Sequence, residues 1–411
     1  PGLEVIETVS DILKDVRDDG DKAVLEKTLL YDHATLLPAE ILVNQEKLDD
    51  AETKLSSTER ASIEEAIRNV QLFHEKSMPS DWGTINEHGA EVGEKHYPIK
   101  RVGIYVPGGN VPLVSTVIMT VTLAKVAGVP EIAVVTPPGA DGEVAVQLLG
   151  ALKILGVSEV YRVGGAQAIG ALAYGTESIP AVDKIYGPGN VYVNEAKRQV
   201  FGTVGIDLLP GPSEVMVIAD ETANPAFAAA ALLAQAEHGS GKEKIYFLFT
   251  KETLFSKVVE ELETQVQTLS HRDSIEEVLE SGFRSIFLPE LARISEVANF
   301  IAPEHLELQV SEDNLPLLTK EISTAGAFLM GHCTATSLGD FVAGPSHVLP
   351  TGRSARFSSG LKLNDFFRRT SFIRYNEKSA KKALPVVSEF ALMEQLDAHG
   401  RSLSMRVAKN D

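Results

Sequence analysis

The spacing of hydrophobic and polar residues divides the chain into blocks, and the first block is helical. In "STERASIEEAIRNVQLFHEKS" (57–77), Ser57 or Thr58 is a suitable helix cap, and hydrophobic residues then recur every three or four positions from Ile63 to Phe73. This spacing places the hydrophobic residues on one stripe. The first 80 or so residues share this character, so we expect them to form helices.

From residue 99 the pattern changes to short hydrophobic runs that end in glycine-rich turns. Four such runs are "RVGIYVPGGN", "EIAVVTPPG", "EVYRVGGAQAIG" and "KIYGPGN". Each precedes a helical pattern of roughly ten to fifteen residues, and this alternation is typical of parallel βαβ units. A second series runs through "EVMVIAD", "KIYFLFT", "SIFLP" and "GAFLMG". The chain is therefore predicted to contain two α/β sheets, although no clear sequence repeat relates them.

The pattern changes again after residue 360. The stretch "LKLNDFFRRTSFIRYN" (361–376) is typical of a crossing strand or arm, and helices are expected from about Ser379 to the end. A short helical tail beyond two complete α/β units is suited to packing on a partner chain.

Composition narrows the class of protein. A length of 411 residues suits two or three domains, and the balance of 57 acidic against 38 basic residues, a net charge of −19, argues against binding to nucleic acid or an anionic membrane. The longest hydrophobic candidate, "VPLVSTVIMTVTLAKVAG", is interrupted by Pro112 and Lys125, so no membrane-spanning helix is expected.

Cysteine usage and the chain start bear on location. The single Cys333 excludes an intramolecular disulfide and suits a reducing compartment. The sequence starts without Met inside a helical pattern, so a processed or trimmed N-terminus is expected. We expect a cytoplasmic location, or a plastid if a transit peptide was removed.

Two glycine loops are candidates for phosphate binding. "VGGAQAIG" (163–170) and "GPGN" (187–190) lie where a strand gives way to a helix, where backbone N–H groups and a helix N-terminus can face a phosphate. Neither loop is a full GxGxxG fingerprint, and no acidic residue is obviously placed for a ribose. From the residues alone, nucleotide binding and plain tight turns both stay open.

Polar residues at the end of an alanine-rich helix are candidates for a metal site. In "AQAEHGSG" (234–241), Gln235 and His238 are three residues apart and share a helix face, whereas Glu237 points roughly the opposite way. Gln235 and His238 can thus converge on one ion or substrate. The alternative is a helix end whose polar residues satisfy local carbonyls.

Three further stretches carry acid–histidine pairs. "APEHLEL" places Glu304 and His305 after Pro303, which suits the first turn of a helix. An ionised carboxylate suits activation of water, and an imidazole that titrates near neutral pH suits deprotonation of an alcohol. The alternative is that Glu304 and His305 are neighbours on the surface by chance. The other two pairs are Asp340 with His347 and Glu394 with His399. Because no HExxH, CxxC or GxSxG motif is present, the fold would have to assemble any metal site from N and O ligands.

Taken together, these stretches resemble histidinol dehydrogenase over nearly the whole chain. The resemblance rests on "DVRDDGDKAV", "YVPGG", "VGGAQAIGALAYGTE", "YGPGNVYVNEAKRQVFGTVGIDLLPGPSEVMVIAD", "AQAEH", "APEHLEL", "GPSHVLPTG" and "LDAH". It implies an α/β fold of two incomplete Rossmann-like α/β/α domains and a small helical C-terminal dimerisation tail. The domains implied are 1–104 with 213–360 (metal and catalytic residues), 105–212 (NAD side), and 361–411, swapped in a dimer.

The resemblance also implies an activity and its site residues. The family oxidises L-histidinol to L-histidine through an aldehyde, with two NAD, one water and one zinc ion per subunit. By this resemblance, Glu304 and His305 are the catalytic residues, and the zinc ligands are Gln235, His238, Asp340 and, from the other subunit of a homodimer, His399. The substrate pocket consists of Ser213, His347 and Glu394, together with His305 and the four zinc ligands. The NAD contacts are Tyr105, Gln167 and Asn190. His305 would take the alcohol proton, and Glu304 would activate water on the aldehyde.

Two positions depart from the family pattern, and two other functions stay open. Ala335 and Thr336 stand where the family usually has Pro-Glu, and Ala231 stands where an acidic residue is common. One alternative is a zinc-dependent relative that oxidises another small alcohol, such as a sulfonated diol, although Glu394 argues against an anionic substrate. The other is a non-catalytic nucleotide-binding or assembly protein, against which the presence of both Glu304 and His305 argues.

Overall fold

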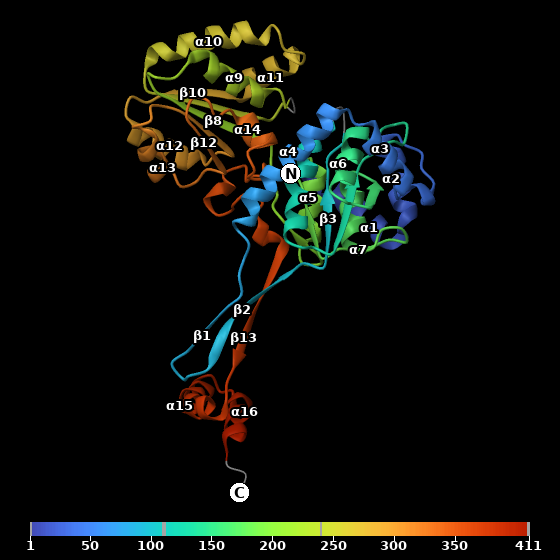
Figure 1. Cartoon of the computed structure of the whole chain (residues 1–411), viewed down its shortest axis with the longest axis vertical. Coiled ribbons are helices and arrows are strands. Elements are labelled where there is room, and N and C mark those ends of the chain that lie inside the picture. The colour runs from blue at the N-terminus through green and yellow to red at the C-terminus, as the bar shows by residue number, and fades with distance from the viewer. Residues whose placement is uncertain (1, 109–111, 239–240, 409–411) are drawn as a thin grey trace.

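The computed structural model describes residues 2–108, 112–238 and 241–408. Figure 1 shows two α/β lobes side by side and a long arm that projects from them and ends in a helical pair. Within the described ranges, no helix is both long and apolar enough to cross a bilayer. Gly109 and Asn110 of "YVPGGN" and Gly239 and Ser240 of "AQAEHGSG" lie outside the described residues.

The first lobe is a five-stranded parallel sheet with the strand order β5-β4-β3-β6-β7. Alternate residues of its strands are buried on opposite faces, in two separate hydrophobic clusters. The strands are β3 (Arg101–Tyr105), β4 (Glu131–Thr136), β5 (Glu159–Arg162), β6 (Lys184–Tyr186) and β7 (Gly205–Ile206). The helices are α5 (Val114–Val126) and α6 (Val146–Ile154) on one face, and α7 (Gly165–Tyr174) and α8 (Val191–Val200) on the other.

The N-terminal helices also belong to this lobe. They are α1 (Leu3–Asp19), α2 (Asp21–Asp32), the 3₁₀ turn η1 (Pro38–Glu40), α3 (Gln45–Lys54) and α4 (Ser57–Glu75). The apolar stripes of α1 and α2 pack beside α7, and those of α3 and α4 beside α5 and α6. This packing differs from the expected grouping of residues 1–104 with 213–360. The α4 cap is Ser56, one residue before the predicted position.

The second lobe repeats the same topology, with the strand order β10-β9-β8-β11-β12 and all pairs parallel. Its strands are β8 (Glu214–Ala219), β9 (Lys244–Phe249), β10 (Phe283–Phe287), β11 (His305–Gln309) and β12 (Ala327–Met330). Its helices are α9 (Pro225–Ala236), α10 (Glu252–Val266), α11 (Arg272–Gly282), α12 (Leu291–Ile301), α13 (Leu315–Glu321) and α14 (Thr336–Phe341). The predicted pair of Rossmann-like units is therefore confirmed.

One predicted local structure is wrong. Pro303 does not open a helix, because α12 ends at Ile301 and is capped by Ala302, whose φ of 51° is left-handed, and the chain then enters β11. All five residues of β11 are buried between β8 and β12, so the hydrogen bonding of a central strand outweighs the proline signal. Glu304 and His305 thus lie at the amino end of a strand.

The projecting arm is a three-stranded antiparallel sheet that carries the C-terminal helices; the sequence predicts its last strand and these helices, but not β1 and β2. It consists of β1 (Trp82–Ile85), β2 (Glu91–Pro98) and β13 (Phe367–Arg374), followed by α15 (Glu377–Met393) and α16 (Asp397–Val407). Two 3₁₀ turns precede the arm, η2 (Ser354–Arg356) and η3 (Leu363–Phe366). Because Phe366 stacks on Tyr186 at 4.1 Å, η3 still belongs to the first lobe.

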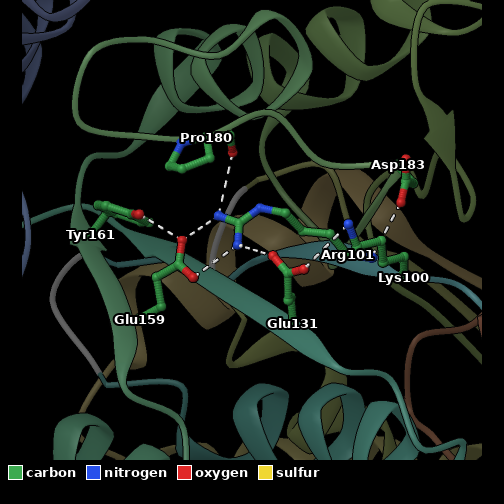
Figure 2. Close-up of polar contacts among 7 residues, drawn as sticks. All are labelled: Lys100, Arg101, Glu131, Glu159, Tyr161, Pro180 and Asp183. Atoms are coloured by element: carbon green, nitrogen blue, oxygen red, sulfur yellow. Dashed lines mark hydrogen bonds and ion pairs between the residues drawn. The ribbon is translucent and has the colours of Figure 1, made fainter.

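Buried and half-buried charges join the strands at the amino edge of the first sheet, as Figure 2 shows. The Arg101 guanidinium donates to Glu131 at 3.1 Å and to Glu159 at 2.9 Å, and Tyr161 donates to Glu159 at 2.6 Å. These residues begin β3, β4 and β5 or lie close to the start. The network therefore fastens one end of the sheet and leaves the opposite, carboxyl edge free for a ligand.

Candidate active site

Glu304 and His305 are held by the backbone of the neighbouring strand. The Glu304 carboxylate accepts a hydrogen bond from the Glu214 N–H through Oε2 at 2.8 Å, and His305 Nδ1 lies 3.3 Å from the Glu214 carbonyl oxygen. Donation by Nδ1–H to this carbonyl leaves Nε2 as the nitrogen that can exchange a proton with a substrate. Both side chains are buried, and they approach each other to 3.8 Å between Nδ1 and Oε2.

Asp340, in α14, joins this pair from a different part of the second lobe. Its Oδ1 lies 3.4 Å from His305 Nε2, and its backbone carbonyl lies 2.9 Å from His347 Nδ1. Burial opposes ionisation of Asp340, but a hydrogen bond with His305 and the nearby imidazoles of His305, His347 and His238 lower its pKa. Asp340 is therefore an anion that contacts the imidazole of His305 and is near enough to His347 and His238 to be stabilised by their charge.

Burial and charge set the protonation states of the catalytic candidates. Burial is the main cause that raises the pKa of Glu304 to about 7, and the nearby imidazole of His305 partly offsets this shift. For His305, burial lowers the pKa, but the contact with Asp340 and the charge of Glu304 outweigh it and raise the pKa to about 9. Two adjacent groups thus titrate on either side of pH 8, which suits acid–base chemistry.

The polar end of α9 lies at the same site. Gln235 is buried, and its Nε2 has no hydrogen-bond partner among the described residues. The helix ends at Ala236, so His238 lies just beyond it, where its N–H donates to the Gln235 carbonyl at 3.3 Å. α9 and α14 are in contact, and His238 is close enough to Asp340 to lower its pKa. Ser213 directly precedes β8 at the same edge of the sheet.

Two predicted site residues lie elsewhere in this chain. Glu394 caps the end of α15 and His399 lies in α16, and both are exposed. Figure 1 shows α15 and α16 at the far end of the arm, away from both lobes. Among the described residues of one chain, no group of three or more His, Cys, Asp and Glu side chains is arranged to hold a metal ion.

The three predicted cofactor residues line one cavity of about 810 Å³ in the first lobe. Tyr105 ends β3, Gln167 lies in the first turn of α7, and Asn190 caps α8 by accepting from the Tyr192 and Val193 N–H groups at 3.0 and 3.1 Å. These positions form the carboxyl edge of the sheet, where β3 and β6 diverge into helices on opposite faces. Open α/β sheets bind ligands at such a point.

An unsatisfied amide points to a polar ligand in this cavity. Gln167 is fully buried, yet neither its Oε1 nor its Nε2 has a hydrogen-bond partner among the described residues. The Tyr105 hydroxyl accepts a hydrogen bond from the Gly165 N–H at 3.2 Å, which fixes the start of α7. Because buried polar groups are normally paired, a ligand that bonds to Gln167 would satisfy the site.

A segment of the second lobe connects the two sites. His347 Nε2 lies 3.5 Å from the Thr116 hydroxyl of α5, and the Ser346 hydroxyl donates to the Met119 carbonyl at 3.1 Å. α5 begins close to Pro112, which lines the cavity. The acid–base residues of the second lobe and the cavity of the first lobe are thus joined through α5.

Sequence reasoning missed Glu214 and Thr116, because Glu214 acts through its backbone and Thr116 lies inside a hydrophobic helix with no polar motif. The structure also shows what Thr336, one of the departures from the family pattern, contacts. The Thr336 hydroxyl donates to the buried Glu307 at 3.2 Å, so β11 supplies a carboxylate next to α14. Ala231 is buried in α9 and adds no polar contact.

Known proteins resemble this chain along its whole length. The family model for histidinol dehydrogenase matches residues 3–407. The histidinol dehydrogenase of Aquifex aeolicus is 45% identical over 409 residues, covering 99% of this chain and 93% of the relative, and that of Clostridium acetobutylicum is 41% identical over 403 residues, covering 98% and 92%. The crystal structure of the Elizabethkingia anophelis histidinol dehydrogenase superposes with a TM-score of 0.94 at 34% identity, covering 99% and 93%. The chain therefore belongs to the histidinol dehydrogenase family of oxidoreductases.

Proposed function

We propose that this chain catalyses the NAD-dependent, four-electron oxidation of L-histidinol to L-histidine through L-histidinaldehyde, the last steps of histidine biosynthesis. The observation that carries the proposal is the convergence of Glu304, His305 and Asp340 at one buried edge of the second sheet, joined through α5 to the cavity lined by Gln167. Membership of the histidinol dehydrogenase family supports the choice of substrate.

In the proposed first step, the substrate alcohol becomes an aldehyde and loses two electrons and two protons. His305 would take the hydroxyl proton at Nε2 in its neutral form, whose population rises toward pH 9, where the ring titrates. Its Nδ1 is directed at the Glu214 carbonyl, which keeps the ring in one orientation. NAD, when bound, is the two-electron acceptor of this step and of the second. Tyr105, Gln167 and Asn190 would hold NAD in the first-lobe cavity.

In the proposed second step, water adds to the aldehyde and the hydrate is oxidised to the carboxylate. Glu304 would take one proton from this water, since its carboxylate is fixed by the Glu214 N–H and ionised above about pH 7. The second proton would pass from the hydrate to Nε2 of neutral His305 as the hydride passes to NAD. Oxidation of a hydrate needs no thiol nucleophile, and the only cysteine, Cys333, is exposed.

The residues present fit a zinc ion, although one chain supplies only part of the set. The amide oxygen of the buried Gln235, the anionic Asp340 and the nearby His238 offer the N and O donors that zinc accepts. Zinc, when bound, would orient the amino alcohol and stabilise charge that develops on it. We propose His399 of the partner subunit as the fourth ligand, with Glu394 of the partner subunit in the substrate pocket.

Exposed hydrophobic side chains support a homodimer with shared active sites. Leu392 and Met393 of α15 and Met405 of α16 are exposed at the end of the arm, and Leu338 and Phe341 are exposed on α14, the helix that carries Asp340. Apolar surface of this kind is commonly covered by a partner. Contact between the arm of one copy and α14 of another would cover both patches and bring His399 to Asp340.

Substrate turnover tests the chemistry of the proposal. We expect NADH from histidinol but not from plain or sulfonated diols, loss of activity after chelation, and recovery on return of Zn²⁺. Turnover of a sulfonated diol in preference to histidinol would select the alternative relative, and full activity after exhaustive chelation would exclude the metal.

Mixed dimers test the shared site. A His399→Ala chain and a His238→Ala chain each lack one proposed ligand, so every site in either homodimer is incomplete. A mixed dimer contains one site with both substitutions and one intact site, and should recover up to about half the activity per dimer. Absence of recovery in verified mixed dimers would contradict the exchange of His399.

A further inference from the structure

Asp32 places an unpaired carboxylate in the first-lobe cavity. It is the last residue of α2 and lines the cavity together with Tyr105 and Gln167. Its Oδ2 is buried and has no hydrogen-bond partner among the described residues, and burial raises the pKa of the carboxyl to about 6. A buried acceptor of this kind is expected to meet a donor from a ligand.

The strand that usually supplies an acidic residue in this fold supplies none here. In dinucleotide-binding sheets, an Asp or Glu near the end of the second strand accepts hydrogen bonds from the adenosine ribose. The equivalent strand, β4, ends at Thr136 and continues as Pro137, Pro138 and Gly139, all of which line the cavity. α2 lies outside the sheet, yet it brings Asp32 to this same cavity.

The other acidic residue of the cavity already has partners. Glu143 accepts a hydrogen bond from Lys47 Nζ at 2.5 Å and lies 4.0 Å from Arg162. Its charge is therefore largely balanced by two cations. Asp32 lies next to His33, which has a smaller influence on its pKa than burial does. Of these two acids, Asp32 is the one available to a ligand.

The position of α2 identifies the part of a dinucleotide that would reach Asp32. Figure 1 shows α5 on the side of the first lobe that faces the second lobe, and α2 on the outer side. The reacting end of the cofactor must lie toward α5, because Thr116 of α5 approaches His347 of the active site. The adenosine end would then lie toward α2, where Tyr31, Ile12 and Pro137 offer an aromatic and apolar wall to a purine.

We propose that Asp32 selects NAD over NADP by accepting hydrogen bonds from the adenosine ribose hydroxyls and by repelling a 2′-phosphate. This inference rests on the proposed function, because it assigns the first-lobe cavity to NAD. Beyond the proposed function, the inference names a residue that determines cofactor specificity and that comes from a helix outside the sheet. A 2′-phosphate carries about two negative charges, which would be forced next to a partly buried carboxylate that has no cation partner among the described residues.

The test compares NAD and NADP in the unsubstituted enzyme and in Asp32→Asn, by titration calorimetry and by kcat/KM with histidinol. Asp32→Asn should weaken NAD binding about tenfold or more and reduce the NAD:NADP preference by a larger factor, since it removes both the charged acceptor and the repulsion. Asp32→Glu should retain most of the preference. Glu26→Gln removes a charge from the exposed face of α2 and should leave the preference unchanged.

The outcomes separate this inference from the proposed function. If the unsubstituted enzyme binds NAD and oxidises histidinol, but a folded Asp32→Asn variant keeps the original NAD:NADP preference, the role of Asp32 is refuted and the proposed function stands. If the unsubstituted enzyme binds neither nucleotide, both are refuted. Equal loss of preference in Asp32→Asn and Glu26→Gln would show a general charge effect and would also overturn the assignment.

Discussion

Replacement of Lys197 by Met should destabilise the first lobe and weaken cofactor binding. Lys197 lies in α8, and both its side chain and that of Asp207 are fully buried. The ammonium group donates to the Asp207 carboxylate, to the Gly187 carbonyl at 3.0 Å and to the Leu208 carbonyl at 2.8 Å. Asp207 also accepts from the Gly187 N–H at 2.8 Å. The pair thus fastens the start of the loop that leads to Asn190.

The expected magnitude follows from the burial of the pair. Met retains the packing of the Lys197 methylene groups but leaves the Asp207 charge buried without its cation, a change that typically lowers the free energy of unfolding by about 3–5 kcal/mol. For a lobe of this size, roughly 2–4 °C of melting temperature corresponds to each kcal/mol, so the shift should be about 6 to 20 °C. Addition of Asp207→Asn should restore part of this loss, because it removes the stranded charge.

Thermal unfolding followed by circular dichroism, with NAD binding measured at low temperature, checks this prediction. The Gly187 backbone lies so close to β3 that an added Cβ would meet the Tyr105 carbonyl oxygen at 2.0 Å, so displacement of this loop should disturb both Tyr105 and Asn190. NAD binding should therefore weaken. Lys22→Met, at an exposed position of α2, is the matched control. A Lys197→Met variant that melts within about 2 °C of the control, with NAD affinity unchanged, would refute the reasoning.

Three further predictions concern the catalytic pair and the amino edge of the first sheet. Glu304→Gln should slow aldehyde oxidation by about 10²-fold or more while sparing alcohol oxidation, whereas His305→Ala should impair both half-reactions. Single-turnover kinetics with histidinol and with the aldehyde would measure the two steps separately. Equal effects of both variants on both steps would contradict the assigned roles. Burial raises the pKa of Glu304 to about 7, and the base must be ionised, so the rate of aldehyde oxidation should fall as the pH drops below about 7. A rate that is constant down to pH 5 would exclude Glu304 as this base. Arg101→Met should lower the free energy of unfolding by about 2 kcal/mol, because Arg101 loses its hydrogen bonds to Glu131 and Glu159. NAD affinity should stay unchanged, since Arg101 lies at the opposite edge of the sheet from the cavity. Weaker NAD binding in a calorimetric titration would contradict this prediction.

The alternation of short hydrophobic runs with helical patterns was sufficient to predict both sheets, because parallel strands covered by helices on both faces have little polar surface. β11 was missed as a strand, since His305 and Glu307 within it, and Glu304 just before it, make the sequence look amphipathic. Only its burial between β8 and β12 reveals its role. Periodicity cannot show which strand each run pairs with, so the packing of the N-terminal helices on the first sheet also went unpredicted.

Part of the candidate site was predictable from short stretches that pair an acidic residue with a histidine. Glu304 and Asp340 carry recognisable local motifs, and the fold brings them to one place. Asp32 and Glu214 gave no comparable signal, because one reaches the cavity from a separate helix and the other acts through its main chain. The proposed contribution of His399 would depend on a second copy of the chain, which no pattern within one copy can locate.

The stoichiometry of a single turnover tests the central claim most directly. With zinc-loaded enzyme in excess over histidinol and with NAD in excess over both, two equivalents of NADH and one of histidine should form for each histidinol consumed, because the buried Glu304–His305 pair serves both oxidations. One equivalent of NADH, with the aldehyde released and no histidine formed, would contradict the claim that a single site completes the four-electron reaction.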